Sequence, residues 1–142
     1  MFTPVNYGGH NPPAVEYLPA GAITPKFGMA VALNPSTGYL AASAKPTHIS
    51  VMESSAALAA GTLIPVIRIS DNIVFESTLD GTTTLKAGAL ADVDSTGMLI
   101  DGDGSTNKVF LIEVLEGTVQ GSKVRGRFVR ADGQDNVDAT ST

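Results

Sequence analysis

Residues 27–33 read FGMAVAL, and residues 36–40, which follow after a short gap, read STGYL. The same pattern returns at an offset of about sixty residues, with AGALADV at residues 87–93 and STGML at residues 95–99. The first copy is one residue longer between these two segments, and the extra residue is assigned to Pro35. The similarity extends further, and the additional matches are HISVME (48–53) with KVFLIE (108–113), Gly61 with Gly121, and IPVIRI (64–69) with VRGRFV (124–129). Similarity in four segments predicts two copies of one structural unit.

Each copy alternates short apolar runs with glycine-containing turns, as all-β proteins do. The turn signals are NPSTG at residues 34–38 and DSTG at residues 94–97, each with apolar runs on both sides. A copy of about sixty residues buries little surface when it folds alone. We therefore expect an all-β fold, with two related repeats, each like a small barrel or sandwich, packed together. Residues 53–60 contain four alanines and leave room for one short helical turn.

The repeat divides the chain into five segments. Residues 1–20, with four prolines and the pair Gly8-Gly9, predict an extended N-terminal arm. Residues 21–70 form the first predicted repeat and residues 85–130 the second. Residues 71–84 form a connecting strand or linker, since their β-prone run IVFESTL predicts one further strand. Residues 131–142 are rich in Asp, Gly, Ser and Thr, and we expect a flexible tail.

Composition excludes several classes of protein. A net charge of −5 disfavours a nucleic-acid binder, which must neutralise phosphates with Lys and Arg. The absence of cysteine excludes disulfides and thiolate metal sites. No signal-peptide pattern begins the chain, and no apolar stretch approaches the ~18 residues that span a bilayer. We expect a protein made in the cytoplasm, with neither a membrane nor a nucleic acid as partner.

Residues able to perform acid–base or nucleophilic chemistry are few. His10 and His48 are the only imidazoles, one in the arm and the other at the start of a predicted strand. Glu53 and Glu113 occupy matching positions in the two copies, which favours a repeated structural role over a divided acid–base task. We therefore expect no catalytic residue, no cofactor and no enzymatic activity.

The densest group of oxygen donors is formed by Asp92, Asp94, Asp101 and Asp103. Calcium prefers several oxygen ligands from flexible loops, but the run DGDGSTN at residues 101–107 lacks the order of an EF-hand loop. Asp and Gly are also ordinary turn residues, and this second interpretation is favoured, so that no metal site is expected.

Basic side chains concentrate at Lys123, Arg125 and Arg127, which share one face of a predicted strand because they alternate. They could meet an acidic partner surface. They could equally form a solvated strand face that discourages pairing between sheet edges. Both interpretations stand on the sequence.

Several segments resemble the head decoration, or cement, proteins of tailed phages. These segments are LPAGAI (18–23), GMAVAL (28–33), AAGTLIPV (59–66), LKAG (85–88) and GSKVRGRF (121–128). The resemblance covers residues 18–129 and rests on small-residue punctuation of β-strands. It implies a non-enzymatic structural protein on the outer surface of the virion head, which clamps neighbouring major capsid proteins. Many such proteins are trimers and others are dimers or monomers, so a homo-oligomer is expected, with a homotrimer favoured over a dimer. The alternative is a recognition module displayed on the virion, such as a head-fibre base or a carbohydrate- or receptor-binding domain.

The resemblance further implies an N-terminal arm that orders on the capsid by adding a strand to it, as extended peptides do at sheet edges. The candidate capsid-contacting residues are Phe2, Pro4, Val5, Tyr7, Pro12, Pro13 and Tyr17 of the arm, with Lys123, Arg125 and Arg127 of the basic strand. On this hypothesis, removing residues 1–20 leaves the fold intact and abolishes binding to mature heads.

Overall fold

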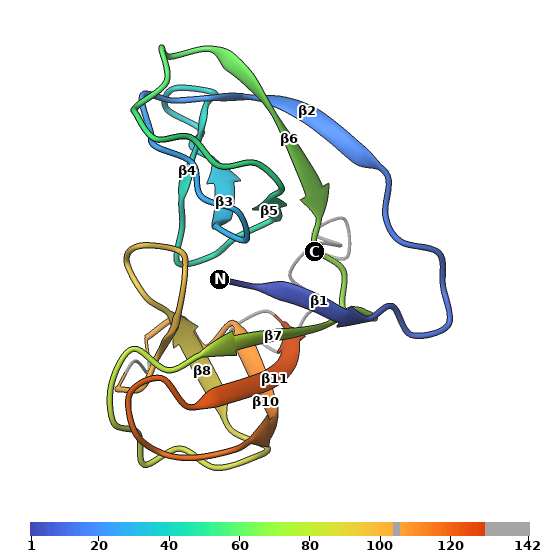
Figure 1. Cartoon of the computed structure of the whole chain (residues 1–142), viewed down its shortest axis with the longest axis vertical. Coiled ribbons are helices and arrows are strands. Elements are labelled where there is room, and N and C mark those ends of the chain that lie inside the picture. Colours follow the sequence, from blue (N-terminus) through green and yellow to red (C-terminus); the bar gives the residue numbers. More distant parts are fainter. Residues whose placement is uncertain (104–105, 130–142) are drawn as a thin grey trace.

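The computed structural model describes residues 1–103 and 106–129, and these residues form an all-β protein without a helix. Figure 1 shows two β units, one above the other. The upper unit contains β2 (Val15–Ala20), β3 (Ala30–Leu33), β4 (Leu40–Ala42), β5 (His48–Ser50) and β6 (Thr62–Arg68). The lower unit contains β7 (Val74–Thr78), β8 (Leu90–Val93), β9 (Ile100–Asp101), β10 (Phe110–Leu115) and β11 (Lys123–Phe128), and it is joined by β1 (Thr3–Asn6).

Both units have the same strand topology. The first is a closed barrel in the order β2-β4-β3-β5-β6, in which Ala20 of β2 pairs in parallel with Leu40 of β4. The second has the order β7-β11-β10-β8-β9, and a parallel bridge between Leu79 and Ile100 links its two ends. Strands β2 to β6 therefore correspond one by one to β7 to β11.

Equivalent hydrogen bonds support this correspondence. The Gly61 N–H donates to the Ala20 carbonyl at 2.7 Å, and the Gly121 N–H donates to the Leu79 carbonyl at 3.0 Å. Gly61 and Gly121 both have a positive φ, 91° and 87°, a conformation that costs glycine little. The prediction of two related repeats packed together is thus confirmed.

The predicted boundaries of the repeats are displaced. The first barrel begins at Val15, within the predicted arm, because β2 pairs with β6 along its whole length. The predicted connecting segment contains the expected strand, but this strand, β7, is the first strand of the second unit and does not simply link the two repeats. The sequence comparison missed this pair because β2 (VEYLPA) and the residues of β7 (VFEST) share only their first valine.

The strand ladders also correct two details of the repeat alignment. Residues 34–39 and residues 94–99 form hairpin loops of equal length, between Leu33 paired with Leu40 and Val93 paired with Ile100, so no residue is skipped at Pro35. Ser50 pairs with Val66 as Ile112 pairs with Gly126. The sequence comparison had placed Glu53 and Glu113 at equivalent positions, and the strand pairing shows that this prediction is wrong.

Two hydrophobic clusters hold the molecule together. The smaller cluster fills the first barrel and includes Val31, Leu40, Ile64 and Val66. The larger cluster fills the second unit and continues onto the first, because it includes Ile49 of β5 and Ile67 of β6. Since apolar burial is the main favourable term in folding, this shared cluster joins the two units into one body.

The N-terminal segment is part of that body. Strand β1 pairs antiparallel with β7, and the Phe2 side chain is fully buried. Its ring lies 5.2 Å from that of Phe128 and 5.9 Å from that of Phe110, measured between centroids. Residues 2–6 and 15–20 of the predicted extended arm are therefore docked within the fold, because strand pairing fixes both segments and aromatic burial fixes the first.

Residues 53–60 contain no helix, and the expected helical turn is not formed. The Ser54 hydroxyl instead donates to the Ala56 carbonyl at 2.7 Å. The predicted tail at residues 131–142 lies outside the described residues. In the part of the chain that the structure describes, no helix has the length and apolar character needed to cross a membrane.

Candidate functional site

The basic residues of β11 are largely engaged within the chain. Arg125 Nε donates to Glu76 Oε2 at 2.9 Å, and Arg127 Nε donates to Glu113 Oε2 at 2.8 Å. Strand β11 lies between β7 and β10, so its charges cannot serve to protect a sheet edge, which was one of the two interpretations. Lys123 is exposed at the start of the strand. The three residues share a strand, but intramolecular ion pairs occupy two of them.

The acidic cluster supports the backbone. The Asp92 carboxylate is buried and accepts hydrogen bonds from the N–H groups of Thr106, Asn107 and Lys108, at 3.1, 3.0 and 2.6 Å. Asp94 Oδ1 accepts from the Thr96 hydroxyl at 2.7 Å within its turn. Among the described residues, no group of three or more His, Cys, Asp or Glu side chains is placed to hold a metal ion.

Replacing Asp92 with asparagine is expected to lower the free energy of unfolding by about 2 kcal/mol, because hydrogen bonds to a charged acceptor are stronger than those to a neutral one. The amide offers one acceptor oxygen where the carboxylate offers two. Chemical denaturation measures the change. The matched control is Asp103→Asn, at an exposed position in the same region, and an equal loss in both variants would contradict the assigned role of Asp92.

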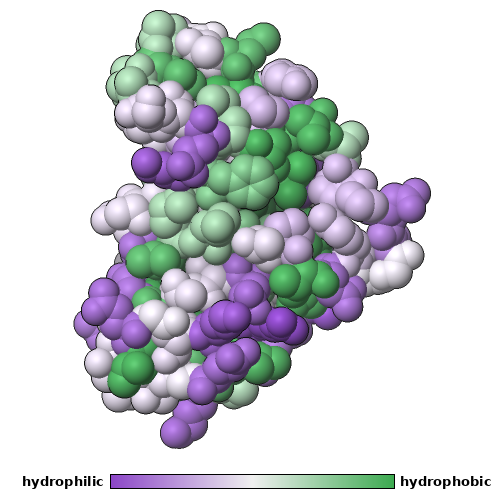
Figure 2. Space-filling model, viewed as in Figure 1, coloured by the Kyte–Doolittle hydropathy of each residue, from purple (hydrophilic) through white to green (hydrophobic). Residues whose placement is uncertain are grey.

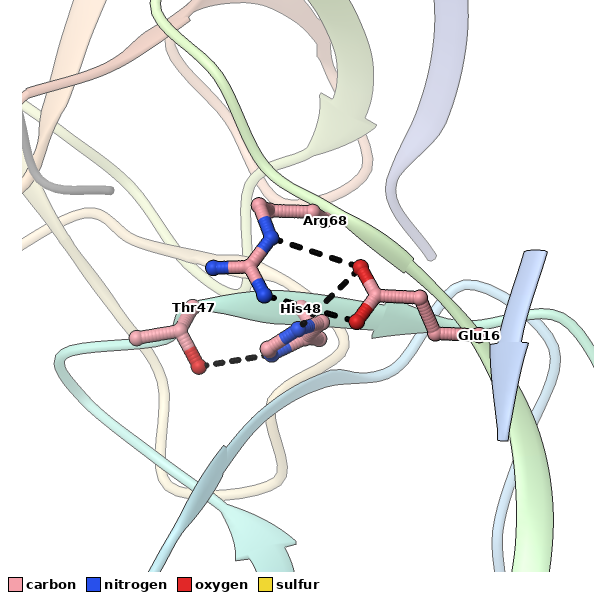
Figure 3. Close-up of polar contacts among 4 residues, drawn as sticks. All are labelled: Glu16, Thr47, His48 and Arg68. Carbon is pink, nitrogen blue, oxygen red and sulfur yellow. Dashed lines mark hydrogen bonds and ion pairs between the residues drawn. The ribbon is translucent and has the colours of Figure 1, made fainter. Parts of the chain in front are cut away.

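A second polar cluster lies where β2, β5 and β6 meet (Figure 3). The Arg68 guanidinium contacts the Glu16 carboxylate, with Nε 3.3 Å from Oε2 and Nη2 3.4 Å from Oε1. The His48 ring is buried beside this pair, with Nδ1 2.8 Å from the Thr47 hydroxyl oxygen. His48 Nε2 is 4.0 Å from Glu16 Oε2 and has no hydrogen-bond partner among the described residues.

The surroundings of His48 favour its neutral form. Burial lowers the pKa of His48 below its usual value of 6.5, the Arg68 charge lowers it further, and Glu16 opposes both. His10, the other imidazole, is exposed and lines a different hollow. The hydrogen bond between the neutral His48 imidazole and the Thr47 hydroxyl is part of the packing of β5.

Stability should fall on acidification from pH 7 because of His48. Because the pKa of His48 is lower in the folded protein than in the unfolded chain, the unfolded chain takes up the proton first as the pH falls. The contribution of neutral His48 to the free energy of unfolding is therefore fully present above pH 6.5 and is lost as the pH falls toward the pKa of the folded state. The His48→Gln variant should lack this loss, whereas His10→Gln should keep it. Thermal melting between pH 5 and pH 8 measures the effect, and identical pH profiles for both variants would exclude His48 as its source.

Five of the seven candidate arm residues line one apolar hollow. The hollow has a volume of about 280 Å³, and Pro4, Tyr7, Pro12 and Pro13 line it from the N-terminal side. Phe2 also borders it, although that side chain belongs to the core. The opposite wall is the outer face of the first barrel, with Val15, Ile49 and Ile67. The structure therefore brings most of the arm candidates together around one hollow.

Exposed apolar side chains continue from this hollow along the first barrel. Val15 and Tyr17 of β2 are 51% and 64% exposed, and Leu63 of β6 is 60% exposed. On the face seen in Figure 2, hydrophobic surface gathers over the first barrel and the middle of the molecule, while the second unit is mainly hydrophilic. Val5 of β1 is also exposed, at 42%. The exposed Tyr17 side chain is accessible to a partner, but Tyr17 belongs to strand β2 of the first barrel.

Sequence reasoning missed Val15, Ile49, Ile67 and Leu63 as surface or pocket residues. Ile49 and Ile67 lie in the matched segments 48–53 and 64–69, and that match predicts strands without showing which face of a barrel each residue occupies. Recognising β2 as an equivalent of β7 would have identified Val15 as a strand residue, but the two strands are too dissimilar for that. Neither the protein-family models nor the curated proteins that were searched contain a match to this chain.

Proposed function

We propose that this protein is a non-enzymatic structural module that binds the outer surface of a phage head and stabilises it by clamping neighbouring major capsid proteins. The observation that carries the proposal is the pair of barrels with one topology, joined through a shared core. A clamp needs at least two attachment surfaces at a fixed separation, and two related barrels in one chain supply them. The resemblance of residues 18–129 to decoration proteins supports the capsid as the partner.

Physical arguments favour attachment through apolar contacts and backbone pairing more than through charge. Arg125 and Arg127 already have intramolecular carboxylate partners, and the chain is acidic overall. Several weak contacts made by one rigid body reinforce one another, because the second contact forms at high effective concentration. A homotrimer, which the resemblance implies, would multiply this effect.

Co-sedimentation with mature and immature tailed-phage heads that lack the protein tests the proposal. Saturable binding to mature heads is expected, and the mass in solution, measured by light scattering, gives the number of copies bound per assembly. The protein centrifuged without heads is the control for self-association. Failure of the folded protein to bind any head would overturn the proposal and favour the displayed recognition module.

A further inference from the structure

The equivalence of the two barrels extends to a slot beside their first strands. In the second unit, β1 occupies the edge of β7 and pairs Thr3 with Glu76, Pro4 with Phe75 and Asn6 with Val74. Glu76 pairs on its other side with Arg125, as Tyr17 of β2 pairs with Pro65. The slot that β1 fills on β7 therefore corresponds to the edge of β2 over Val15–Tyr17.

That edge of β2 is open. Strand β2 pairs with β6 along its length and with β4 only at Ala20. No strand within residues 1–103 and 106–129 pairs with the opposite edge over Val15–Tyr17. Figure 1 shows β2 at the rim of the first barrel, with β6 on its inner side.

The backbone of Tyr17 points toward this open edge. The Pro65 carbonyl accepts a hydrogen bond from the Val51 N–H at 3.1 Å, so Pro65 directs its backbone groups away from β2. Residues opposite each other in an antiparallel ladder either exchange both bonds or exchange none. Tyr17, which lies opposite Pro65, therefore presents its N–H and C=O to the open edge, and alternation places Val15 on the same side. Pro19 faces the same side of β2 by this alternation, and because proline has no N–H, no backbone donor at that position is left without a partner.

Side chains beside the edge add an apolar anchor point. Val15 and Tyr17 are both more than half exposed, and Val15 also lines the 280 Å³ hollow. The occupied slot has its apolar anchor at the opposite end, because Phe2 lies beyond the pair of Thr3 with Glu76, the equivalent of Tyr17, and is buried against the second unit's aromatic rings. A strand added to β2 would find its apolar anchor point at the Val15 end instead, in the hollow that Val15 lines.

We propose that the open edge of β2 accepts an extended, uncharged segment of a partner protein. This segment lies antiparallel to β2 over Val15–Tyr17 and places a large apolar side chain in the adjoining hollow. Backbone hydrogen bonds supply part of the affinity and the hollow supplies selectivity, as in other strand additions. A second copy of β2 is a poorer occupant, because symmetric pairing over these residues sets Glu16 opposite Glu16, and like charges in that position are destabilising.

A synthetic peptide with the sequence of residues 1–8 is a suitable probe, because it copies the segment that fills the equivalent slot. Fluorescence anisotropy of the labelled peptide measures binding to the full-length protein. Amide NMR spectra of the protein locate the bound peptide. Saturable binding with shifts at the Val15 and Tyr17 amides is expected, and the variant carrying Val15→Lys and Tyr17→Lys should lose it.

The matched control carries Val114→Lys and Val119→Lys, two exposed valines of the second unit, and should bind as the unchanged protein does. Melting curves establish that both variants fold. Absence of saturable binding up to the solubility limit of the peptide would overturn the proposal, as would shifts confined to the amides of β7. A dimer in solution that the β2 variant dissociates would also overturn it, since a second copy would then occupy the edge.

When the capsid is the partner, this inference identifies the attachment edge and rests on the proposed function, but the peptide experiment requires no capsid. In the co-sedimentation assay, loss of head binding by the β2 variant alone is expected. Heads that bind both lysine variants equally would overturn the role of β2 while leaving the capsid function standing. If heads bind no form of the protein, the proposed capsid function is overturned, and the peptide experiment alone decides whether β2 accepts a strand.

Discussion

Replacing Phe2 with alanine is expected to lower the free energy of unfolding by about 3–5 kcal/mol, the cost of deleting a large buried aromatic side chain. The Phe2 side chain is fully buried, and its ring packs against Phe110 and Phe128. The Phe2 N–H also donates to the Gly28 carbonyl at 2.9 Å, which links the start of the chain to the first barrel. The substitution therefore weakens the contact between the two units, and denaturant unfolding measures the loss.

Val5→Ala is the control for Phe2→Ala. Val5 lies in the same strand, but it is 42% exposed, and truncation there should cost roughly 0.5 kcal/mol. Equal stability of the two variants would show that Phe2 is not part of the core. The same argument corrects the expectation that residues 1–20 can be removed harmlessly. Their removal deletes both β1 and β2, and β2 is needed to close the first barrel.

Replacing Gly126 with alanine is expected to destabilise the protein by about 3 kcal/mol or more, at the upper end of the range for overpacking. A Cβ at this position would lie 2.0 Å from the Leu111 carbonyl oxygen and 2.7 Å from the Phe110 ring. Gly126 sits in the central strand β11, so neither neighbour can move without disturbing the ladder. Reduced thermal stability, or failure to fold, is the expected result.

Gly81→Ala is the matched control, because a Cβ there meets no atom within 4 Å and the residue has no positive φ. That variant should melt close to the unchanged protein. The ladder places Gly126 where the first barrel has Val66, and Phe110 where it has His48. In the second unit, the Phe110 ring thus occupies the space that a side chain at position 126 would need. A Gly126→Ala variant as stable as the Gly81→Ala variant would contradict this account.

The positions of the candidate residues in the structure show which of their properties could be predicted from the sequence. The alternation of Lys123, Arg125 and Arg127 correctly placed them on one strand face, because side-chain direction in a strand follows from position alone. Their ion pairs with Glu76 and Glu113 depend on which strands become neighbours. Phe2 shows the same limit, since a proline-rich start gives no sign that its first aromatic residue joins a distant core.

Local pattern and self-similarity were sufficient to establish the all-β class, the two related repeats and the glycines at their turns. Three features could be known only from the folded chain: the first repeat begins at Val15, β1 crosses to the second unit, and the edge of β2 stays open. Backbone pairing tolerates almost any side chain at an edge, so dissimilar strands can occupy equivalent places. Long-range pairing and the shared core therefore settle what local patterns leave undecided.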